Sequence, residues 1–365
     1  MSAVKRDFFD GRKVLITGHT GFKGGWLTLI LNKLGAEVTG LSLAPDQGPD
    51  NIFDRASIES ACHSVIGDIR DRALVDRVFA ETQPSLVFHL AAQPLVRRSY
   101  ADPIGTFASN VMGTAHVLEA SRTCGSVEAV VCVTTDKVYE NREWNWPYRE
   151  NEPLGGIDPY SASKSAAEMV ARAYMTTLNS ACECRIATAR GGNVVGGGDW
   201  SEDRIVPDIV RAVRAGASLV LRHPGATRPW QHVLEACDGY MLLAQRLIEG
   251  RSSRGKTGAD FIGAWNFGPD AALETPVSEL AQRMLEAMAR DDHPVELGDS
   301  TVHESSYLRL DSTKAVVELG WRQKLDFAAT MSATAEWYRD YLADPARARD
   351  LIERQIDHYL ELESC

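Results

Sequence analysis

The chain lacks the features of a membrane-spanning or secreted protein. No uninterrupted apolar stretch approaches the roughly 20 residues that a helix needs to cross a bilayer. The first residues mix charges with two phenylalanines and contain no apolar signal core. We therefore expect a soluble, cytoplasmic protein without a membrane partner.

Cysteine is sparse and shows no pairing pattern. The seven cysteines include no Cys-x-x-Cys pair and no spacing typical of metal ligands. An odd number in a chain of this length fits a reducing compartment better than a disulfide framework. We expect free thiols, several of them buried, and no metal site.

The chain also lacks a basic excess. A formal net charge of −11 argues against nucleic acid as the main partner, because phosphate backbones require a basic surface. Any anionic substrate must then be neutralised by a local group of arginines and lysines. The 365 residues show no internal repeat, and their number suits a large α/β unit with a smaller lobe.

What the first half does contain is an alternation of strand-like and helix-like segments. Short apolar runs bounded by turns are typical of parallel strands covered on both faces, and amphipathic stretches separate them. The expected strands are residues 13–17, 37–42, 65–67, 86–91, 129–135 and 185–190, and the expected helices are 24–34, 70–81, 106–124 and 159–178. This order predicts an α/β fold with a doubly wound, parallel, Rossmann-type sheet.

The second half changes character after residue 192. Loops rich in glycine, proline and tryptophan separate expected helices at 206–215, 234–249, 276–290, 327–341 and 346–361. Residues 265–268 resemble one more short strand that could rejoin the sheet. We expect residues 1–192 to form a dinucleotide-binding domain, to which segments near 232–268 return. Residues 193–365 should form mainly a smaller α/β substrate-binding lobe.

A glycine-rich turn, Gly18-His19-Thr20-Gly21-Phe22-Lys23-Gly24, follows the first expected strand and opens a helix. Its glycines permit a tight turn and let the backbone approach a pyrophosphate at the helix N-terminus. The spacing is Gly-x-x-Gly-x-x-Gly, not the better-known Gly-x-Gly-x-x-Gly. The residues expected to bind the dinucleotide here are Gly18, Thr20, Gly21, Phe22, Lys23 and Gly24.

Further cofactor contacts are expected where the next strands end. The second strand lacks the terminal carboxylate that commonly holds the adenosine ribose, so the choice between NAD and NADP stays open at this point. Asp68 could accept a hydrogen bond from the adenine amine, cap the helix at 70–81, or do both. Ile69, the next residue, is also expected to contact the cofactor. Leu90, Ala91 and Ala92 stand where the fourth strand should pass the cofactor.

Tyr160 and Lys164 are four residues apart in Asp-Pro-Tyr-Ser-Ala-Ser-Lys. Asp158 can cap a helix whose first residue is Pro159, which places the phenol and the ammonium one turn apart on one face. A phenol has a pKa near 10, and an adjacent ammonium would favour the phenolate and make it a usable base. The alternative is a surface helix in which this tyrosine and lysine are incidental.

Together these residues resemble the extended short-chain dehydrogenase/reductase superfamily, over most of the chain. Within it the sequence is similar to the nucleotide-sugar dehydratases, most closely to the branch that acts on CDP-glucose. The resemblance is carried by Gly18–Gly24, Thr134–Tyr139, Tyr160 with Lys164, Arg190–Gly196, Arg228–Val233 and Leu308–Asp311 before Lys314.

The resemblance implies bound NAD and an internal redox cycle on the hexose of CDP-glucose. The sugar would be oxidised at C4 while Tyr160 removes the hydroxyl proton and Thr135 bonds the same oxygen. Lys164 would hold the cofactor ribose and keep Tyr160 acidic. Water would then be lost across C5 and C6, and hydride would return to C6.

Asp136 and Lys137 would be the acid and the base of this water loss. Asp136 must then hold a proton near neutral pH, which requires a raised pKa, and Lys137 must release one. Burial favours both, whereas their mutual attraction opposes it. The chain has Thr-Asp-Lys, as the CDP-glucose branch does, where the dTDP-glucose dehydratases have Thr-Asp-Glu. The alternative is a structural salt bridge between the two side chains.

Arginines are the natural ligands of the substrate's diphosphate, because guanidinium binds phosphate bidentately. We expect Arg228 and Arg309 to bind it, and Asn193 to donate from the turn after the sixth strand. Arg204 and Arg222 lie nearby in the sequence, but surface exposure explains each equally well.

Two other classes of function remain open. The chain could be a 4-epimerase, which does not need Asp136 and Lys137, or a dehydratase that acts on another nucleotide sugar. It could also be a dinucleotide-binding regulator without turnover, although Tyr160 and Lys164 are both present. The resemblance further implies a homodimer or homotetramer, built on the helices at 106–124 and 159–178.

Overall fold

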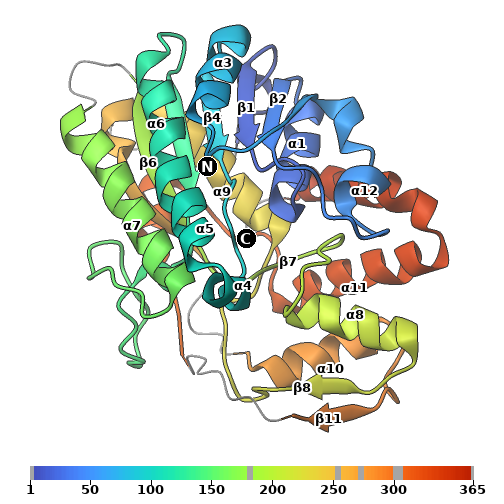
Figure 1. Ribbon diagram of the computed structural model, residues 1–365. Helices are drawn as coiled ribbons and strands as arrows, with labels where there is room; N and C mark the ends of the chain where they lie inside the picture. Colours follow the sequence, from blue (N-terminus) through green and yellow to red (C-terminus); the bar gives the residue numbers. More distant parts are fainter. Residues whose placement is uncertain (1–3, 179–183, 251–255, 270–274, 299–306, 363–365) are drawn as a thin grey trace.

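The computed structural model describes residues 4–178, 184–250, 256–269, 275–298 and 307–362 (Figure 1). The strands are β1 (Lys13–Thr17), β2 (Glu37–Ser42), β3 (His63–Ile66), β4 (Leu86–His89), β5 (Ala129–Val133), β6 (Arg185–Gly191), β7 (Val194–Val195), β8 (Leu219–Leu221), β9 (Gln231–His232), β10 (Gly263–Phe267) and β11 (Val295–Leu297). The α-helices are α1 (Phe22–Lys33), α2 (Ile52–Arg55), α3 (Arg72–Thr82), α4 (Val96–Ala101), α5 (Pro103–Phe107), α6 (Thr114–Thr123), α7 (Pro159–Ala173), α8 (Ile205–Ala215), α9 (Val233–Glu249), α10 (Val277–Ala287), α11 (Phe327–Ala343) and α12 (Ala348–Glu361).

The central sheet has seven parallel strands in the order β10-β6-β5-β4-β1-β2-β3. The chain runs outward from β1 to β3, then crosses back over β1 and continues in the other direction from β4 to β10. The predicted doubly wound, Rossmann-type sheet is therefore confirmed. The short strand expected near 265–268 does rejoin it, as the edge strand β10 beside β6.

Alternate residues of each strand point to opposite faces, so the sheet separates two apolar cores. On one face Leu15, Val87 and Val130 pack beneath α3 and α6. On the other face Val14, Ile16 and the helices α1 and α9 belong to a second, larger core. Figure 1 shows α3, α6 and α7 side by side over the first face. Because both faces are covered, the strand interiors are dry.

The smaller lobe lies below the sheet in Figure 1 and contains α8, α10 and the parallel pair β8–β11. α11 packs on α10, and α12 reaches back to α1. The sequence did not predict β8 and β11, because three residues are too few to show an alternating pattern. In the described residues no helix has the length and apolarity to span a bilayer, and Cys62, Cys124, Cys132, Cys184 and Cys237 are free thiols.

The helix expected at 106–124 is longer than predicted and interrupted. α5 begins at Pro103, where the Asp102 side chain accepts a hydrogen bond of 2.8 Å from the Gly105 amide. A π-helical turn, Ala108–Gly113, then joins α5 to α6. Such turns occur frequently at functional sites, because they re-aim a side chain within a helix.

The turn between β1 and α1 requires glycine at two positions. Gly18 has a φ of +87°, and a Cβ there would lie 2.8 Å from the Ala91 amide nitrogen. A Cβ on Gly24 would lie 2.0 Å from the carbonyl oxygen of Gly18. Backbone therefore packs directly on backbone where the helix starts.

Replacement of Gly24 by alanine should lower the free energy of unfolding by about 1–3 kcal/mol, the usual cost of forced overpacking. Gly25→Ala is the matched control, because a Cβ there would meet the Ile52 Cγ2 at an ordinary 3.6 Å. Alanine is also the better helix former, so this variant should match or slightly exceed wild-type stability. Urea unfolding of both variants checks this, and equal stabilities would contradict the packing argument.

Candidate active site

The candidate site is a cavity of about 1310 Å³ at the carboxyl edge of the central sheet. Its walls come from the loops after β4, β5 and β6, from the start of α7, and from the α8 and β8 regions of the smaller lobe. Ligands of doubly wound sheets bind at this edge, near the point where the strand order reverses. The cavity thus lies between the sheet and the smaller lobe.

α7 brings Tyr160 and Lys164 into this cavity. Its N-terminus is fixed by a capping box: the Asp158 carboxylate accepts from the Ser161 amide at 3.0 Å, and the Ser161 hydroxyl accepts from the Asp158 amide at 3.2 Å. Pro159 occupies the first helical position, as predicted from the sequence. Tyr160 and Lys164 both line the cavity wall.

Burial is the largest influence on the pKa values of this pair. Burial raises the pKa of Tyr160 to about 12, whereas its hydrogen bond with Thr135 and the charge of Arg204 lower it. The Lys164 ammonium donates to the Val133 carbonyl at 3.1 Å. Burial also lowers the pKa of Lys164 to about 8, opposed by the carboxylate of Glu168. That the lysine makes this phenol more acidic stays a prediction.

Thr135, Asp136 and Lys137 follow the end of β5 and also line the cavity. Asp136–Val138 forms a 3₁₀ turn whose N-cap is Thr135, and the Thr135 hydroxyl donates to one Asp136 oxygen at 3.0 Å. The other carboxylate oxygen is buried without a partner in the described structure. Burial raises the pKa of Asp136, although Lys137, Thr135 and Arg228 act against it. The carboxyl group is thus biased toward its protonated form, as an acid requires.

Asp136 and Lys137 do not form the salt bridge that was the alternative interpretation. Both residues are described, and no ion pair joins them, although the charge of Lys137 acts on the carboxylate from a distance. Lys137 is half-buried and its amide donates to the Thr135 hydroxyl at 3.3 Å. Its side chain is available to a molecule in the cavity.

The glycine-rich turn lies beside the cavity, and Lys23 is the member that lines it. Burial, with help from Arg204 and Lys164, lowers the pKa of Lys23 to about 8. The Thr20 hydroxyl lies 2.7 Å from the Ser42 hydroxyl and donates to the Leu43 carbonyl. Thr20 does not line the cavity. The same is true of the other expected members of this turn, which are Gly18, Gly21, Phe22 and Gly24.

The residues expected at the next strand ends divide into two groups. Leu90 and Ala92 line the cavity, whereas Ala91 packs on Gly18. Asp68 and Ile69 lie outside the cavity wall. The Asp68 carboxylate is held by the Arg70 guanidinium at 2.6 and 2.8 Å, which lowers its pKa.

The alternative role of Asp68 as a helix cap is wrong, because Asp71 caps α3 by accepting from the Leu74 amide at 3.1 Å. Ile69 is buried against the π turn, where its side chain lies in the space that a Cβ on Gly113 would need. Its carbonyl lies 3.0 Å from the His116 Nδ1.

Two of the three expected substrate residues reach the cavity. Asn193 and Arg228 line it, and Arg228 is buried and close enough to Asp136 to affect that carboxyl group. Arg309 does not line it: its guanidinium lies 5.7 Å from the centre of the Tyr307 ring, and its neighbour Leu308 is the lining residue. The expectation for Arg309 thus finds no support in the position of its side chain.

Several residues of the site were missed from the sequence. Asn110, in the π turn, donates to the Ser163 hydroxyl at 2.8 Å, and Ser163 in turn donates to the Tyr160 carbonyl at 2.7 Å. An asparagine in the middle of a predicted helix was a usable signal, because its side chain competes with the helix backbone. This chain of bonds fixes the helical turn that carries the phenol.

Charged residues bridge the mouth of the cavity from both sides. Arg97 of α4 pairs with Asp203 at 3.3 Å, and Asp203 also pairs with Arg222 at 2.8 Å. Arg204 pairs with the buried Asp199 at 3.1 Å. Arg204 and Arg222 both line the cavity. The sequence alone could not distinguish them from ordinary surface residues.

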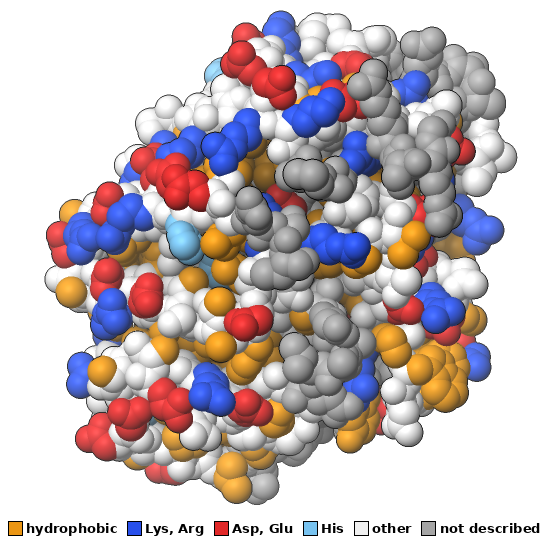
Figure 2. All heavy atoms as spheres, turned by 180° about the vertical axis from the view of Figure 1, so that it is seen from behind, with side chains coloured by type: hydrophobic (Ala, Val, Ile, Leu, Met, Phe, Trp, Pro, Cys, Tyr) orange, Lys and Arg blue, Asp and Glu red, His pale blue; other side chains and the backbone are white. Residues whose placement is uncertain are grey.

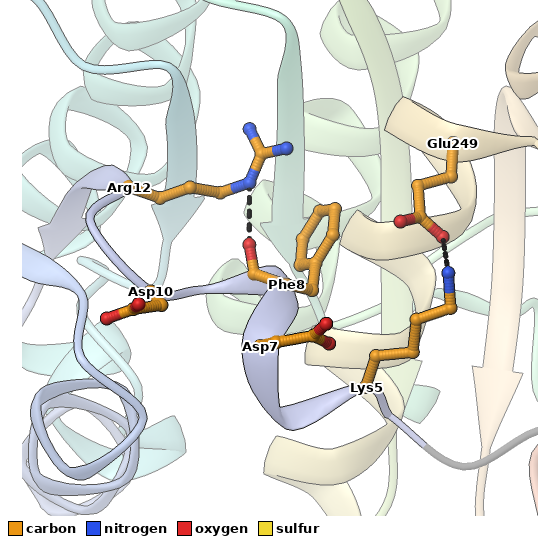
Figure 3. Close-up of a pocket in the computed structure, with 6 residues that line it drawn as sticks. All are labelled: Lys5, Asp7, Phe8, Asp10, Arg12 and Glu249. Atoms are coloured by element: carbon orange, nitrogen blue, oxygen red, sulfur yellow. Dashed lines mark hydrogen bonds and ion pairs between the residues drawn. The ribbon is translucent and has the colours of Figure 1, made fainter.

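A second, much smaller hollow of about 330 Å³ lies at the opposite, amino edge of the sheet (Figure 3). Lys5 pairs there with Glu249 at 2.9 Å, and Arg12 donates to the Phe8 carbonyl at 2.8 Å. The first of these contacts ties the N-terminal segment to α9, and the second lies within that segment. On the face seen from behind, basic and acidic side chains are interleaved (Figure 2). The described residues contain no cluster of His, Cys, Asp or Glu arranged for a metal ion.

Comparison with known proteins agrees with this geometry. Residues 15–334 match the family model described as GDP-mannose 4,6 dehydratase. The chain is 41% identical to the CDP-glucose 4,6-dehydratase of Salmonella typhimurium, over 98% of both chains. It is 29% identical to the UDP-glucose 4-epimerase of Mycolicibacterium smegmatis, over 90% of this chain and 99% of that one. A dTDP-glucose 4,6-dehydratase from Streptomyces venezuelae, solved with NAD bound, has a TM-score of 0.75 and 28% identity, and covers 91% of this chain and 99% of its own.

The depressed pKa of Lys164 makes a prediction about stability. The pKa of Lys164 is about 8 in the folded protein, against 10.5 for an ordinary lysine. Below pH 8, burial of the charged side chain therefore lowers the free energy of unfolding by roughly 3 kcal/mol. Between these two values the unfolded chain binds more protons than the folded one, so wild-type stability rises with pH. Lys164→Met removes this effect.

The stability gained by Lys164→Met over wild type should therefore be largest near pH 7 and shrink by about 1.4 kcal/mol per pH unit above pH 8. Urea unfolding at pH 7, 8, 9 and 10 measures the difference. The loss of the bond to the Val133 carbonyl shifts the stability difference by the same amount at each pH. The test is therefore how the difference between variant and wild type changes with pH. A difference that stays constant with pH would contradict the assigned burial cost.

Proposed function

We propose that the chain is an NAD-dependent hydro-lyase acting on CDP-glucose. The premise is that the chain belongs to the nucleotide-sugar dehydratase family described by the GDP-mannose 4,6 dehydratase model. The product is CDP-4-keto-6-deoxyglucose, formed by oxidation at C4, loss of water across C5 and C6, and return of hydride to C6. The observation that carries this proposal is that Tyr160, Asp136 and Lys137 line one cavity. We call the turn that holds Asp136 and Lys137 the acid–base turn.

NAD fits the residues at the start of α1. The helix has no side-chain cap at Gly21 and no acidic residue in its first turn, so its N–H groups and positive dipole end suit a pyrophosphate. NAD supplies the hydride acceptor for C4 and the donor for C6. The proposed contacts are Gly18, Thr20, Gly21, Phe22, Lys23, Gly24, Leu90, Ala91, Ala92, Tyr160 and Lys164, with Asp68 and Ile69 toward the adenine.

The chain's own groups account for the proton transfers. Tyr160 accepts the proton of the C4 hydroxyl, and the Thr135 hydroxyl bonds the same sugar oxygen. The 4-ketone acidifies the hydrogen on C5, which Lys137 removes; the Lys137 ammonium gives a proton back to C5 when hydride returns to C6. Asp136, whose pKa burial raises, then protonates the C6 hydroxyl as it leaves as water. Asn193 and Arg228 hold the diphosphate, and Arg309 stays a proposal from the sequence alone.

The cavity volume supports two ligands at once. At about 1310 Å³ it exceeds the roughly 300–1,000 Å³ typical of a pocket for one small ligand. We propose that residues 1–192 hold the dinucleotide and residues 193–365 mainly the nucleotide sugar. A cytoplasmic location suits the free cysteines.

A homodimer or homotetramer is the proposed assembly. α5, the π turn and α7 lie together and expose Ile104, Met112 and Met169, which are 79%, 52% and 58% accessible. Exposed apolar side chains on adjacent helices are suited to an interface with a second copy. These are the helices at 106–124 and 159–178 for which the sequence implied such a contact.

A 4-epimerase is the second candidate, since the fold and the Tyr160–Lys164 pair are common to both activities. Epimerisation at C4 does not need a buried acid of raised pKa or a lysine beside it. The acid–base turn therefore favours the dehydratase.

Incubation of the purified protein with CDP-, dTDP-, UDP- and GDP-glucose should yield a 4-keto-6-deoxy sugar with CDP-glucose fastest. Mass spectrometry detects the loss of one water, and NMR assigns the C6 methyl group. A product of unchanged mass with inverted C4 would show an epimerase instead. No reaction with any of the four sugars would overturn the proposed activity.

Lys137→Met should separate oxidation from water loss. Removal of the base should slow product formation by about 10²–10⁴-fold, while the C4 oxidation still occurs and reduced nicotinamide accumulates in the protein. Tyr160→Phe is the contrasting variant, because it should block the oxidation and leave no reduced nicotinamide. Absorbance of the bound cofactor after a single addition of substrate distinguishes them. Normal turnover in Lys137→Met would show that another group is the base.

A further inference from the structure

A buried carboxylate that the proposed reaction does not use lies directly behind the site. Glu168 stands on α7, one turn after Lys164, and forms an ion pair of 2.8 Å with Arg190 of β6. Each of these side chains is only 4% accessible. Two threonines complete the shell: Thr134 donates to one carboxylate oxygen at 2.5 Å and Thr188 to the other at 2.9 Å.

This cluster, Glu168, Arg190, Thr134 and Thr188, holds both ends of the segment that carries the acid and the base. Thr134 lies directly before Thr135 and Asp136, so its bond anchors the start of the segment to α7. The Arg190 guanidinium donates to the Tyr139 hydroxyl at 2.9 Å, which anchors its end. Tyr139 also donates to the Asn266 side chain at 2.7 Å, and so links the anchor to β10. Residues 134–139 are thereby fixed to the same helix that carries Tyr160 and Lys164.

Stability alone is a poor reason for such a pair. A buried ion pair recovers little or nothing beyond the cost of taking two charges out of water, and apolar side chains of equal volume stabilise as well or better. Its geometry, in contrast, is well suited to fixing positions. The carboxylate accepts from Thr134, which follows β5, and from Thr188 and Arg190 of β6. The cluster joins α7, the end of β5 and β6.

We infer that Glu168 is a positioning residue, which with Arg190 sets residues 134–139 at a fixed distance and angle from Tyr160 and Lys164. This inference rests on the proposed function for the roles of the groups that it positions. The phenol must act on C4 and the acid–base turn on C5 and C6 of one bound sugar, so both must meet the same hexose without adjustment. A displacement of about 1 Å in such a site costs on the order of 100-fold in rate.

Glu168→Gln is a weak test, because it leaves the Arg190 guanidinium buried and unpaired and can unfold the protein. The two threonines offer a comparison instead. Because Thr134 also lines the cavity and Thr188 does not, amide exchange is needed beside kcat to separate positioning from contact with a ligand. Thr134→Val and Thr188→Val each remove one buried hydroxyl from the same carboxylate and keep the side-chain shape. Only Thr134 is covalently continuous with the acid–base turn, whereas Thr188 lies within β6.

The expected result is a difference in function without a difference in stability. Both variants should lower Tm to a similar degree. Thr134→Val should lower kcat for CDP-glucose by about 10- to 100-fold with KM changed less than twofold, and Thr188→Val should keep kcat within twofold of wild type. Equal kcat values for the two variants would overturn the inference, because the carboxylate would then be merely structural.

Amide hydrogen exchange gives a readout that does not depend on any substrate. Residues 135–139 should exchange faster in Thr134→Val than in wild type, and at the wild-type rate in Thr188→Val. If this difference is found and the wild-type protein still forms no 4-keto-6-deoxy sugar, the positioning inference stands and the proposed function fails. If the exchange rates of the two variants agree, the positioning inference fails whatever the activity.

Discussion

Desolvation at the carboxyl end of β5 is the constraint on which the rest of the site depends. All five residues of this strand are buried, because a parallel sheet is covered by helices on both faces. The chain leaves the strand at Val133 and carries Asp136 into the cavity while it is still shielded from water. Burial is the leading cause of each pKa shift there: it raises those of Asp136 and Tyr160 and lowers that of Lys164. One physical effect thus favours the neutral form of all three groups.

These shifts destabilise the fold, and local structure compensates for them. The capping box of α7 and the chain of bonds from Asn110 through Ser163 hold the first turn of the helix that carries Tyr160. The ion pair between Arg97 and Asp203 joins the sheet side of the cavity to the smaller lobe. Rigid supports around groups in unfavourable surroundings are the usual arrangement of an active site, since reactivity requires the very environments that cost stability.

Much of the fold followed from local rules in the sequence. The apolar runs predicted the strands of the sheet, and Asp158 followed by Pro159 predicted the start of α7, because strand burial and helix capping depend on neighbours in the chain. The glycine turn was equally readable, since backbone contact at Gly24 excludes any side chain.

What the sequence could not show were partners chosen in three dimensions. The sequence did not show that the Asp68 carboxylate bonds Arg70, or that the cap of α3 is Asp71 rather than Asp68. The sequence did not show that the Lys164 ammonium donates to the Val133 carbonyl. Glu168 and Arg190 are 22 residues apart in the chain, and no spacing rule announces their ion pair. The strands β8 and β11 were too short for any pattern.

The central claim is that, within one cavity, hydride is removed from C4 of the sugar and returned to C6 of the same sugar. Deuterium placed at C4 of CDP-glucose tests this most directly, with the product analysed by NMR and mass spectrometry. The account predicts that the label is found in the C6 methyl group of a product that has lost one water. Label retained at C4, or released to the solvent, would contradict it.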